Sequence, residues 1–241
     1  MKYLMFICGD GLPAPEALAV LQRECPGWVE EMEGRGLRLL GRELELPDTA
    51  AAVRVRDGQT LVTDGPFLET KEFIAGFDLV DCAGPDEAVE VAAKHPSSWF
   101  QAIEIRQFNG GLQLGDQAAA FAREDDSAGA PYLLIMWMGG TPAAPQDDEA
   151  VLQEGQAWRQ EVAARGLHIL GNALQGPDAA RTVRVRDGQT LLSDGPYLGT
   201  SQFAAGIEVV RCADRQQAIQ FAATHPSARY HAVEVRRFYS E

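Results

Sequence analysis

This chain of 241 residues lacks most of the features that assign a protein to a class at first reading. It has no apolar run near the length of about 18 residues that marks a membrane-spanning helix, and its apolar N-terminus is too short for a secretory signal. Basic residues are few, 21 against 35 acidic ones. The formal charge of −14 argues against nucleic acid, because binding to phosphates relies on basic surface. We therefore expect a cytoplasmic protein with neither nucleic acid nor membrane as a partner.

Metal-binding and nucleophile motifs are also missing. The four cysteines show no CxxC spacing. Cys82 and Cys212 fall in apolar runs, which predicts buried thiols. The four histidines lack the spacing of metal ligands, and there is no P-loop, GxSxG elbow or HExxH motif. The sequence thus predicts no metal and no cofactor, and it leaves open whether the protein is an enzyme.

The chain contains an internal repeat. The segment from Val53 to Leu61 returns letter for letter from Val183 to Leu191, a shift of 130 residues. The same shift aligns Trp28 to Phe108 with Trp158 to Phe238 without a gap, and about half of the paired positions are identical. One ancestral unit was therefore duplicated, and two copies of one fold are expected in a pseudo-two-fold arrangement.

The repeat predicts two domains, over residues 1–110 and 131–241, joined by a linker over 111–130. Each repeat reads as strand, helix, strands, helix and strand, which fits a ferredoxin-like α+β unit with an added hairpin. Asp57-Gly58 is a strong type I′ signal for the turn of that hairpin. Pro26 is expected to kink or split the first helix. The two units should pack together as an internal pseudodimer.

Three pairs of segments carry a resemblance to a known family. They are Asp64-Gly65-Pro66-Phe67 with Asp194-Gly195-Pro196-Tyr197, His95-Pro96 with His225-Pro226, and Glu104 to Arg106 with Glu234 to Arg236. In these segments the chain resembles the YCII-related proteins, and within them the subgroup named for its Asp-Gly-Pro-Phe motif. The resemblance implies that two tandem ferredoxin-like units form a dimeric α+β barrel, here within one chain. It implies no secure reaction. Genes of this family often lie beside those for extracytoplasmic-function sigma factors, which implies a sigma factor as one partner.

Two His–Asp pairs are the first candidates for chemistry. A pair of this kind has been proposed as an active site in proteins that the chain resembles. Asp64 with His95 and Asp194 with His225 are present in both repeats. A carboxylate bonded to one imidazole nitrogen raises the basicity of the other, which suits acid/base catalysis near neutral pH. Structural roles are equally available, because Asp-Gly-Pro is ordinary turn chemistry and a histidine before proline can cap a helix.

Lys71 and Glu72 suggest that the first repeat holds the more complete site. In the second repeat they become Ser201 and Gln202, although the flanking residues are unchanged. In the functional interpretation, Lys71 binds an anionic group of a ligand and Glu72 accepts a proton. The alternative is a solvated surface pair that has drifted to neutral residues.

Four further residues need an interpretation. Arg54 and Arg56 lie on the polar face of a predicted strand, where a guanidinium can bind the carboxylate or phosphate of a ligand. Arginines in such a position also pair with acidic neighbours on adjacent strands. His168 and His231 have no histidine at the matching position of the other repeat, so we expect isolated surface or edge histidines.

Two functions remain open on sequence alone. The first is a small-molecule-binding or acid/base site built on a His–Asp pair. The second is a non-catalytic regulatory or protein-interaction module, and further assembly into a homo-oligomer is compatible with both. A deep pocket with convergent polar groups favours the first function. An exposed apolar patch, with Lys71 and Glu72 pointing outward, favours the second.

Overall fold

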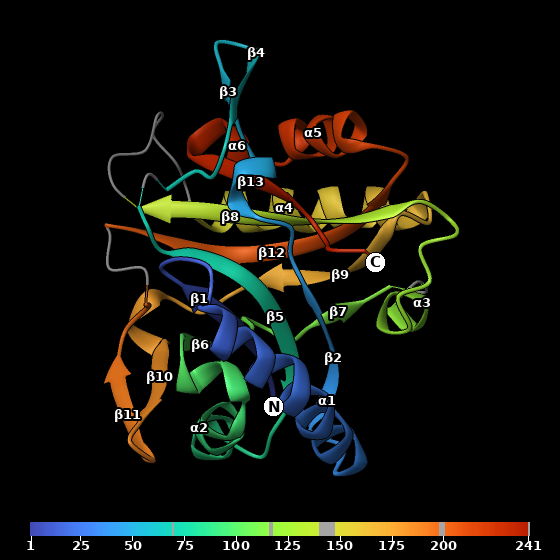
Figure 1. The fold of residues 1–241 in the computed structure, drawn as a ribbon. Helices are drawn as coiled ribbons and strands as arrows, with labels where there is room; N and C mark the ends of the chain where they lie inside the picture. Colours follow the sequence, from blue (N-terminus) through green and yellow to red (C-terminus); the bar gives the residue numbers. More distant parts are fainter. Residues whose placement is uncertain (69, 116–117, 140–147, 198–200, 241) are drawn as a thin grey trace. The chain divides into compact units, whose positions relative to one another are not determined.

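The computed structural model describes residues 1–68, 70–115, 118–139, 148–197 and 201–240 (Figure 1). The strands are β1 (Lys2–Gly9), β2 (Arg38–Glu43), β3 (Ala51–Arg56), β4 (Gln59–Asp64), β5 (Phe73–Asp81), β6 (Ala102–Gln107), β7 (Gln113–Leu114), β8 (Ala130–Gly139), β9 (His168–Ala173), β10 (Arg181–Arg186), β11 (Gln189–Asp194), β12 (Gln202–Cys212) and β13 (Ala232–Arg237). The helices are α1 (Pro15–Gly34), α2 (Pro85–Lys94), α3 (Ala118–Ala122), α4 (Asp148–Ala164), α5 (Arg215–Thr224) and α6 (Ser227–Tyr230), with short 3-10 helices η1 (Pro47–Thr49), η2 (Pro96–Trp99) and η3 (Pro177–Ala179).

The chain divides into two compact units that do not coincide with the two sequence repeats. Unit 1 consists of Met1–Glu43, Thr70–Gly111 and Gln175–Gly199. Unit 2 consists of Leu44–Glu69, Leu112–Leu174 and Thr200–Glu241. The β3–β4 hairpin of the first repeat thus belongs to unit 2, and the β10–β11 hairpin of the second repeat belongs to unit 1. We call this arrangement the hairpin exchange.

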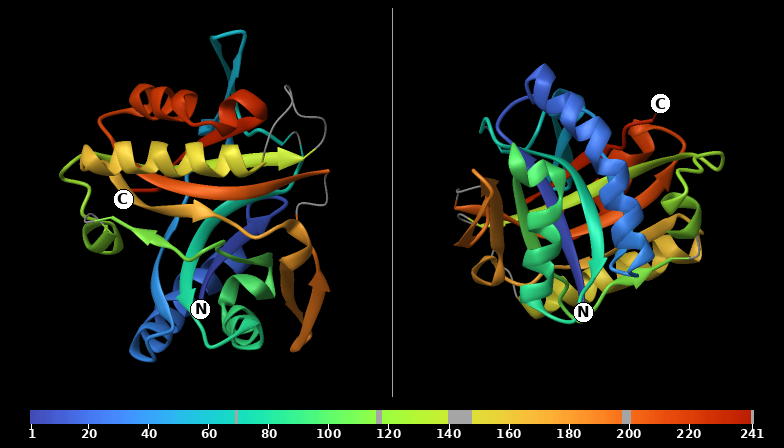
Figure 2. Two further views of the ribbon diagram at one scale, coloured as in Figure 1. Left: turned by 180° about the vertical axis from the view of Figure 1, so that it is seen from behind. Right: turned by 60° about the horizontal axis from the view of Figure 1, so that its bottom comes forward.

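Unit 1 is a ferredoxin-like sheet extended by the exchanged hairpin. Its strand order is β11-β10-β6-β1-β5-β2, and all pairs are antiparallel. Helices α1 and α2 lie on one face of this sheet (Figure 2, right). Alternation along the strands turns Tyr3, Met5 and Val80 toward these helices, where they form a core with Trp28 of α1 and Val91 of α2. Burial of this apolar face holds the unit together.

Unit 2 repeats the plan with strand order β4-β3-β13-β8-β12-β9-β7. Its core joins Leu134 and Val233 of the sheet to Trp158 of α4 and Phe221 of α5. Both helices lie on the same face of the sheet (Figure 2, left). The segment 111–130, expected as a linker, adds the edge strand β7 and the short helix α3 to this unit.

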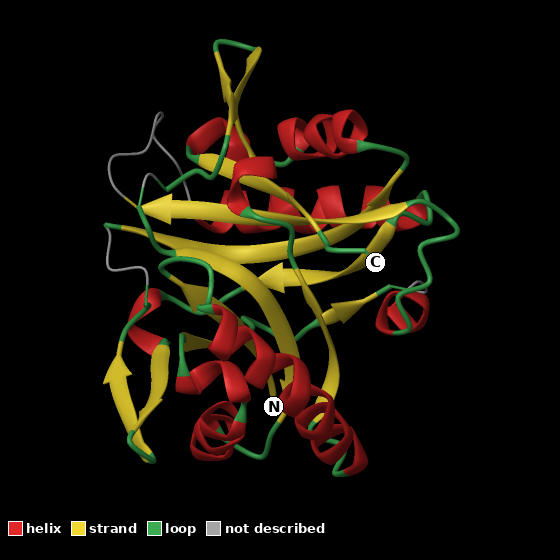
Figure 3. Ribbon diagram, viewed as in Figure 1, coloured by secondary structure: helices red, strands yellow, loops and turns green. Residues whose placement is uncertain are grey.

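The exchanged hairpins contain the turn that the sequence predicted, but each hairpin pairs with a strand of the other repeat. Asp57 and Gly58 have φ values of 51° and 74°, as a two-residue type I′ turn requires. In unit 2, Val53 pairs with Val233 of β13, and in unit 1 Val183 pairs with Ile103 of β6. All four side chains are buried. Each hairpin therefore extends a sheet whose other strands come mainly from the other repeat (Figure 1). Figure 3 draws both hairpins among the yellow strands.

The structure confirms the mixed α+β, ferredoxin-like class, and it shows that Pro26 does not split the first helix. Helix α1 runs without a break through Pro26. This position is exposed, so the carbonyl that loses its helical donor can bond to water. Closure of the two units into a dimeric barrel stays a prediction. No helix within the described residues is both long and apolar enough to span a membrane.

Candidate functional site

A buried carboxylate with two basic partners lies under α1 in unit 1. Asp78 of β5 is 5% exposed. Its Oδ1 accepts from Nε of Arg38 at 2.7 Å, and its Oδ2 lies 3.4 Å from Nε2 of His95. A Cβ at Gly41 on β2 would overlap the carboxylate, so only glycine leaves room for it there. The cluster therefore depends on this glycine opposite the aspartate.

Electrostatics keeps Asp78 ionised. Burial opposes ionisation of the carboxyl, but hydrogen bonding and charge from His95 and Arg38 outweigh it, so the pKa of Asp78 lies below its usual range. His95 is fixed on its other side, because the Ser97 N–H donates to Nδ1 at 3.0 Å. Trp28 packs its ring edge-on against the imidazole, with ring centroids 4.3 Å apart. Both imidazole nitrogens are thus engaged inside the protein.

Unit 2 holds the counterpart cluster with different partners. Glu208, at the position equivalent to Asp78, accepts from Nε of Arg159 at 2.9 Å. Its Oε2 lies 2.8 Å from Nε2 of His168. Burial opposes ionisation, but His168 and Arg159 together lower the pKa of Glu208. His168 is therefore a buried partner of a carboxylate, and the expectation of a surface or edge histidine was wrong. Gly171 leaves room for Glu208 as Gly41 does for Asp78.

His225 occupies the position of His95 but is a neutral residue in an apolar setting. Its Nδ1 accepts from the Ser227 N–H at 3.2 Å, and its ring lies edge-on to Trp158 at 4.9 Å. Burial is the main cause that lowers the pKa of His225 to about 4, although the charge of Glu208 acts in the opposite direction. The ring is therefore uncharged at neutral pH.

Asp64 and Asp194 belong to a different unit from His95 and His225, the histidines with which the sequence paired them. Asp64 ends β4 in unit 2 with its side chain 85% exposed, and it accepts from Arg215 at 2.8 Å. Asp194 ends β11 in unit 1, also 85% exposed, 3.3 Å from Nε of Arg181. The hairpin exchange is the reason, because it moves each aspartate out of the unit that contains its histidine.

Within unit 1 the carboxylate that faces His95 is that of Asp78, a residue that the sequence analysis did not single out. The missed signal is an acidic residue in the middle of an apolar strand in both repeats, Asp78 after Phe77 and Glu208 after Ile207. An acid kept at that position needs buried basic partners. Comparison of the repeats at these two positions would have found it.

Lys71 and Glu72 do not join this cluster. Lys71 is exposed and Glu72 is half-buried, on the segment that leads into β5. Among the described residues, no hydrogen bond or ion pair connects either side chain to His95 or Asp78. Lys71 therefore has the exposed surface position that is expected if this charged pair was replaced by neutral residues in the second repeat.

Arg54 and Arg56 stabilise the base of the exchanged hairpin. The guanidinium of Arg54 lies over the ring of Phe67, 4.9 Å from its centroid. Arg56 donates to the carbonyls of Ala228 and Arg229 at 3.0 Å each and to that of His231 at 2.9 Å, at the end of α6. These partners are backbone carbonyls and an aromatic ring rather than the acidic neighbours that we expected.

The second repeat builds the same hairpin base in unit 1. Arg184 lies over the ring of Tyr197 at 4.9 Å. Arg186 donates to the carbonyls of Ser98 and Trp99 at 2.8 and 3.0 Å. These carbonyls end η2, where helical carbonyls otherwise lack donors. Both hairpins are therefore clamped to a helix end by one arginine.

The Asp-Gly-Pro-Phe segment and the Glu-x-Arg ending form a joint lock for the hairpin exchange. In unit 2 the Phe67 N–H donates to Oε2 of the buried Glu234 at 2.9 Å, and Arg236 donates to the Glu45 carbonyl at 2.7 Å. Trp137 adds a third contact, since its Nε1–H donates to the same Oε2 at 3.0 Å. The carboxylate thus holds the end of the hairpin and the arginine holds its start.

Unit 1 contains the matching lock. The Tyr197 N–H donates to Oε2 of Glu104 at 3.0 Å, and Arg106 donates to the Gln175 carbonyl at 2.7 Å. Glu104 and Arg106 are both buried, and Nη1 of Arg106 lies 3.0 Å from Oε1 of Glu104. Two of the three pairs of segments that gave the resemblance therefore fix the exchange. Within the described residues, no three His, Cys, Asp or Glu side chains come together in a way that would hold a metal ion.

Comparison with known proteins identifies the family. An uncharacterized protein of Rhizobium meliloti (strain 1021) is 56% identical over 48 residues, which cover 20% of this chain and 39% of that protein. The solved structure "Crystal structure of Putative Chlorite dismutase TA0507" aligns with 99% of this chain and 94% of its own, at 10% identity and a TM-score of 0.37. The model of the YCII-related domain matches residues 1–109 and again residues 132–239. The chain therefore belongs to the YCII-related domain family and carries that domain twice.

Proposed function

We propose that this protein is a binding module of the Asp-Gly-Pro-Phe subgroup that pairs the outer strands of its two hairpins with an extended segment of a partner polypeptide. The observation that carries this proposal is a pair of sheet edges, β4 in unit 2 and β11 in unit 1, along which no further strand of the described residues pairs. All six residues of each strand are exposed. An open edge presents unpaired backbone groups that a further strand can pair with.

Each edge also carries apolar side chains at matching positions. Leu61 and Val62 are 48% and 45% exposed, and their counterparts Leu191 and Leu192 are 49% and 52% exposed. Neither strand contains the lysine, proline or bulge with which edge strands are commonly protected. A partner strand could thus gain apolar contacts on both faces as well as backbone hydrogen bonds.

The hairpin register shows which backbone groups point outward. Arg56 and Gln59 flank the two-residue turn, so they form a hydrogen-bonded pair, and such pairs alternate along the ladder. Leu61 therefore bonds inward to Arg54, whereas the N–H groups of Thr60 and Val62 face away from β3. By the same alternation the N–H of Asp64 also faces outward, so three outward donors per hairpin are available to a partner.

The hairpins are held ready for such a partner. Their bases are fixed by the arginine clamps and by the glutamate locks, so little ordering remains to be done on binding. The segment repeated letter for letter includes the exposed residues Gln59, Thr60 and Leu61. Packing inside the protein does not require these three residues, which supports a role at an interface.

Acid/base chemistry has less support from the geometry. A catalytic histidine needs a nitrogen within reach of the reacting group. In His95, the Ser97 N–H occupies one nitrogen and Asp78 faces the other. The sigma factor implied by the resemblance is a partner of the kind that strand pairing requires, namely a polypeptide.

A peptide selection on the full chain tests the proposal. Peptides selected from a random displayed library should protect the Thr60 and Val62 amides from hydrogen exchange when they bind. The double variant Val62→Pro with Leu192→Pro removes one outward donor per edge and should weaken binding about fivefold, since each lost hydrogen bond costs about 1 kcal/mol. The matched variant Val62→Thr with Leu192→Thr keeps both donors. Protection elsewhere, or equal affinity of the proline and threonine variants, would refute strand pairing.

A further inference from the structure

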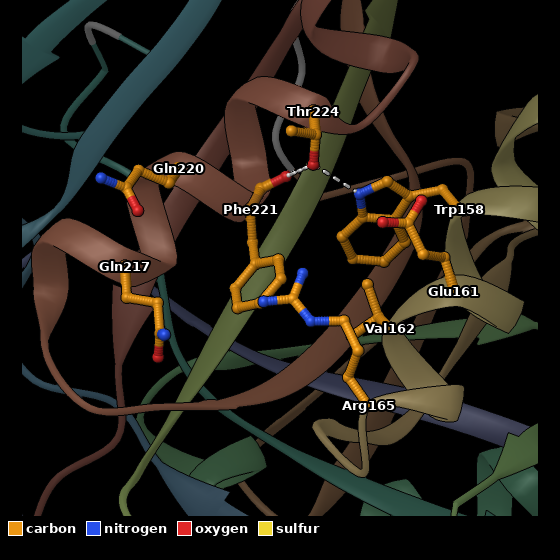
Figure 4. A pocket seen from close by; sticks show the side chains of 8 residues that line it. All are labelled: Trp158, Glu161, Val162, Arg165, Gln217, Gln220, Phe221 and Thr224. Carbon is orange, nitrogen blue, oxygen red and sulfur yellow. Dashed lines mark hydrogen bonds between the residues drawn. The ribbon is translucent and has the colours of Figure 1, made fainter.

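A small groove on unit 2 lies between α4 and α5, on the helical side of the sheet (Figure 4). Its volume is about 140 Å³, room for about five water molecules at their liquid volume. Trp158, Val162 and Phe221 form an apolar floor, and each of them is more than nine-tenths buried. The groove is thus sized for a molecule of metabolite rather than drug dimensions.

Two oppositely charged side chains stand on the α4 side of the groove. The guanidinium of Arg165 lies over the Phe221 ring, 4.8 Å from its centroid. Glu161 precedes it by one helical turn. Neither side chain has an ion-pair partner among the described residues, although their spacing would allow them to pair with each other. A carboxylate and a guanidinium thus face the same groove, both open to a ligand.

The equivalent surface of unit 1 is closed by ion pairs. There Arg35 lies 3.3 Å from Glu31, and Lys94 approaches the same carboxylate at 3.8 Å. In unit 2 the position of Lys94 is taken by Thr224. Its hydroxyl accepts from Nε1 of Trp158 at 2.9 Å and donates to the Phe221 carbonyl at 2.8 Å. The substitution removes a cation and fixes the indole at the floor of the groove.

The side chains on the α5 side of the groove also carry less charge in unit 2 than their counterparts carry in unit 1. Unit 1 has Glu87 and Glu90 where unit 2 has Gln217 and Gln220. Oε1 of Gln217 accepts from the Ala213 N–H at 2.8 Å, which leaves its amide hydrogens to donate. Neutral donors replace two carboxylates, so an anionic group is no longer repelled from this side.

We propose that this groove binds a free α-amino acid with an apolar side chain. The carboxylate of the ligand would bond Arg165, its ammonium group would bond Glu161, and its side chain would rest on Phe221 and Val162. A zwitterion satisfies both open charges at once, whereas a simple acid or amine satisfies one of them. The site shares no residue with the hairpin edges, so the amino-acid-binding proposal can be tested independently of the strand-pairing proposal.

Titration of the full chain with L-leucine, L-methionine and L-phenylalanine tests this site. At millimolar concentration at least one of them should shift the indole N–H resonance of Trp158 and leave that of Trp28 unchanged. The bound amino acid should bind at least tenfold more tightly than its analogues that lack the amine or the carboxylate. If none of the three shifts Trp158, or if an analogue binds as well as the amino acid, the proposal is wrong.

Matched variants locate the contact. Arg165→Gln should weaken binding of the amino acid about tenfold through loss of a charged hydrogen bond. Arg35→Gln makes the same change at the equivalent position of unit 1 and should leave affinity unchanged. Glu161→Gln should weaken the amino acid but not its deaminated analogue. Equal effects of Arg165→Gln and Arg35→Gln would overturn the assignment.

Discussion

The two buried clusters differ in their basic partners and agree in having a carboxylate at equivalent positions, Asp78 on β5 and Glu208 on β12. In unit 1, Asp78 contacts His95 and Arg38, whereas in unit 2 Glu208 contacts His168 and Arg159. Arg38 and His168 occupy equivalent positions, so the second histidine stands where the first repeat has an arginine. The arginine of unit 2 comes instead from α4.

This difference shows what the fold requires at this place. A carboxylate buried in a strand is costly unless its charge is matched, and in each unit one arginine matches it while one histidine lies against the other carboxylate oxygen. The source of the arginine has changed from strand to helix, and a different histidine is used. Charge balance was therefore preserved while the individual pairs were not, which fits a structural role better than a catalytic constellation.

The largest expected effect comes from removing the arginine of each cluster. Arg38→Leu and Arg159→Leu each leave a buried carboxylate with a histidine alone, which should cost about 3–5 kcal/mol of unfolding free energy. Arg38→Leu should cost more, because Arg38 also donates to the Gly41 carbonyl at 3.0 Å. Urea unfolding of both variants measures the comparison. Losses below about 1 kcal/mol would mean that the carboxylates are not ionised in the folded state.

A second prediction concerns how the free energy of unfolding depends on pH. His225 and the buried carboxylates should contribute to this dependence in different pH ranges. The folded pKa of His225 is about 4, below the ordinary value of 6.5. Protonation is therefore disfavoured in the folded state, so its contribution is fully present above pH 6.5 and is lost as the pH falls toward 4. The contribution is on the order of 3 kcal/mol. His225→Asn should flatten the stability profile in this pH window.

The carboxylates contribute acid sensitivity at lower pH, and this part should persist in His225→Asn. The pKa of Asp78 is lowered in the folded state, so its contribution is present above the unfolded pKa and is lost as the pH falls through the folded value. Stability against pH for the wild type, His225→Asn and Asp78→Asn distinguishes the two sources. An unchanged profile in His225→Asn would contradict the burial argument.

The glycines opposite the two acids should give a smaller effect. Gly41→Ala and Gly171→Ala place a methyl group where the carboxylate lies, and overpacking of this kind costs about 1–3 kcal/mol. Gly171→Ala should be the more costly change, because the φ of Gly171 is 159° and an added Cβ would also overlap the backbone carbonyl oxygen of Ile207. Gly58→Ala is not a suitable control because of its positive φ, whereas Gly155→Ala in α4 meets no neighbouring atom.

The smallest effect is expected from the exposed aspartates. Asp64→Asn and Asp194→Asn break surface ion pairs and should change stability by less than about 0.5 kcal/mol. By NMR, Asp64→Asn should leave the ring resonances of His95 unchanged, whereas Asp78→Asn should shift them. The reverse result would restore the His95–Asp64 pair that the sequence suggested.

The sequence predicted the elements well because local signals specify them. Alternating valines and the Asp57-Gly58 turn predicted the β3–β4 hairpin, and apolar runs around Cys82 and Cys212 predicted buried strands with buried thiols. The docking partner of the hairpin could not be predicted in the same way. Because the hairpin segment is repeated letter for letter, its sequence fits β6 and β13 alike, and only connectivity decides between them.

The candidate site was predicted less well for a related reason. Asp64 was chosen because it lies in a distinctive segment, yet that segment is distinctive through its backbone contact with Glu234. Asp78 carries no motif, and its importance comes from burial, which a single position in the sequence does not reveal. Its partners come from β2 and from the end of α2, and such distant pairings leave no local pattern.

The hairpin exchange also affects the order in which the protein can fold during synthesis. Unit 1 needs residues 175–199, which leave the ribosome after the whole of its own α2 and β6. The ribosome adds about 5–20 residues per second, so roughly 4–18 s pass between the synthesis of residue 111 and the synthesis of residue 199, when the last segment of unit 1 is made. During that time Glu104 and the edge of β6 have no hairpin to hold, and the β3–β4 hairpin has no β13 to join. Nascent chains of this protein therefore pass through a period in which neither unit is complete, when assistance from a chaperone would matter most.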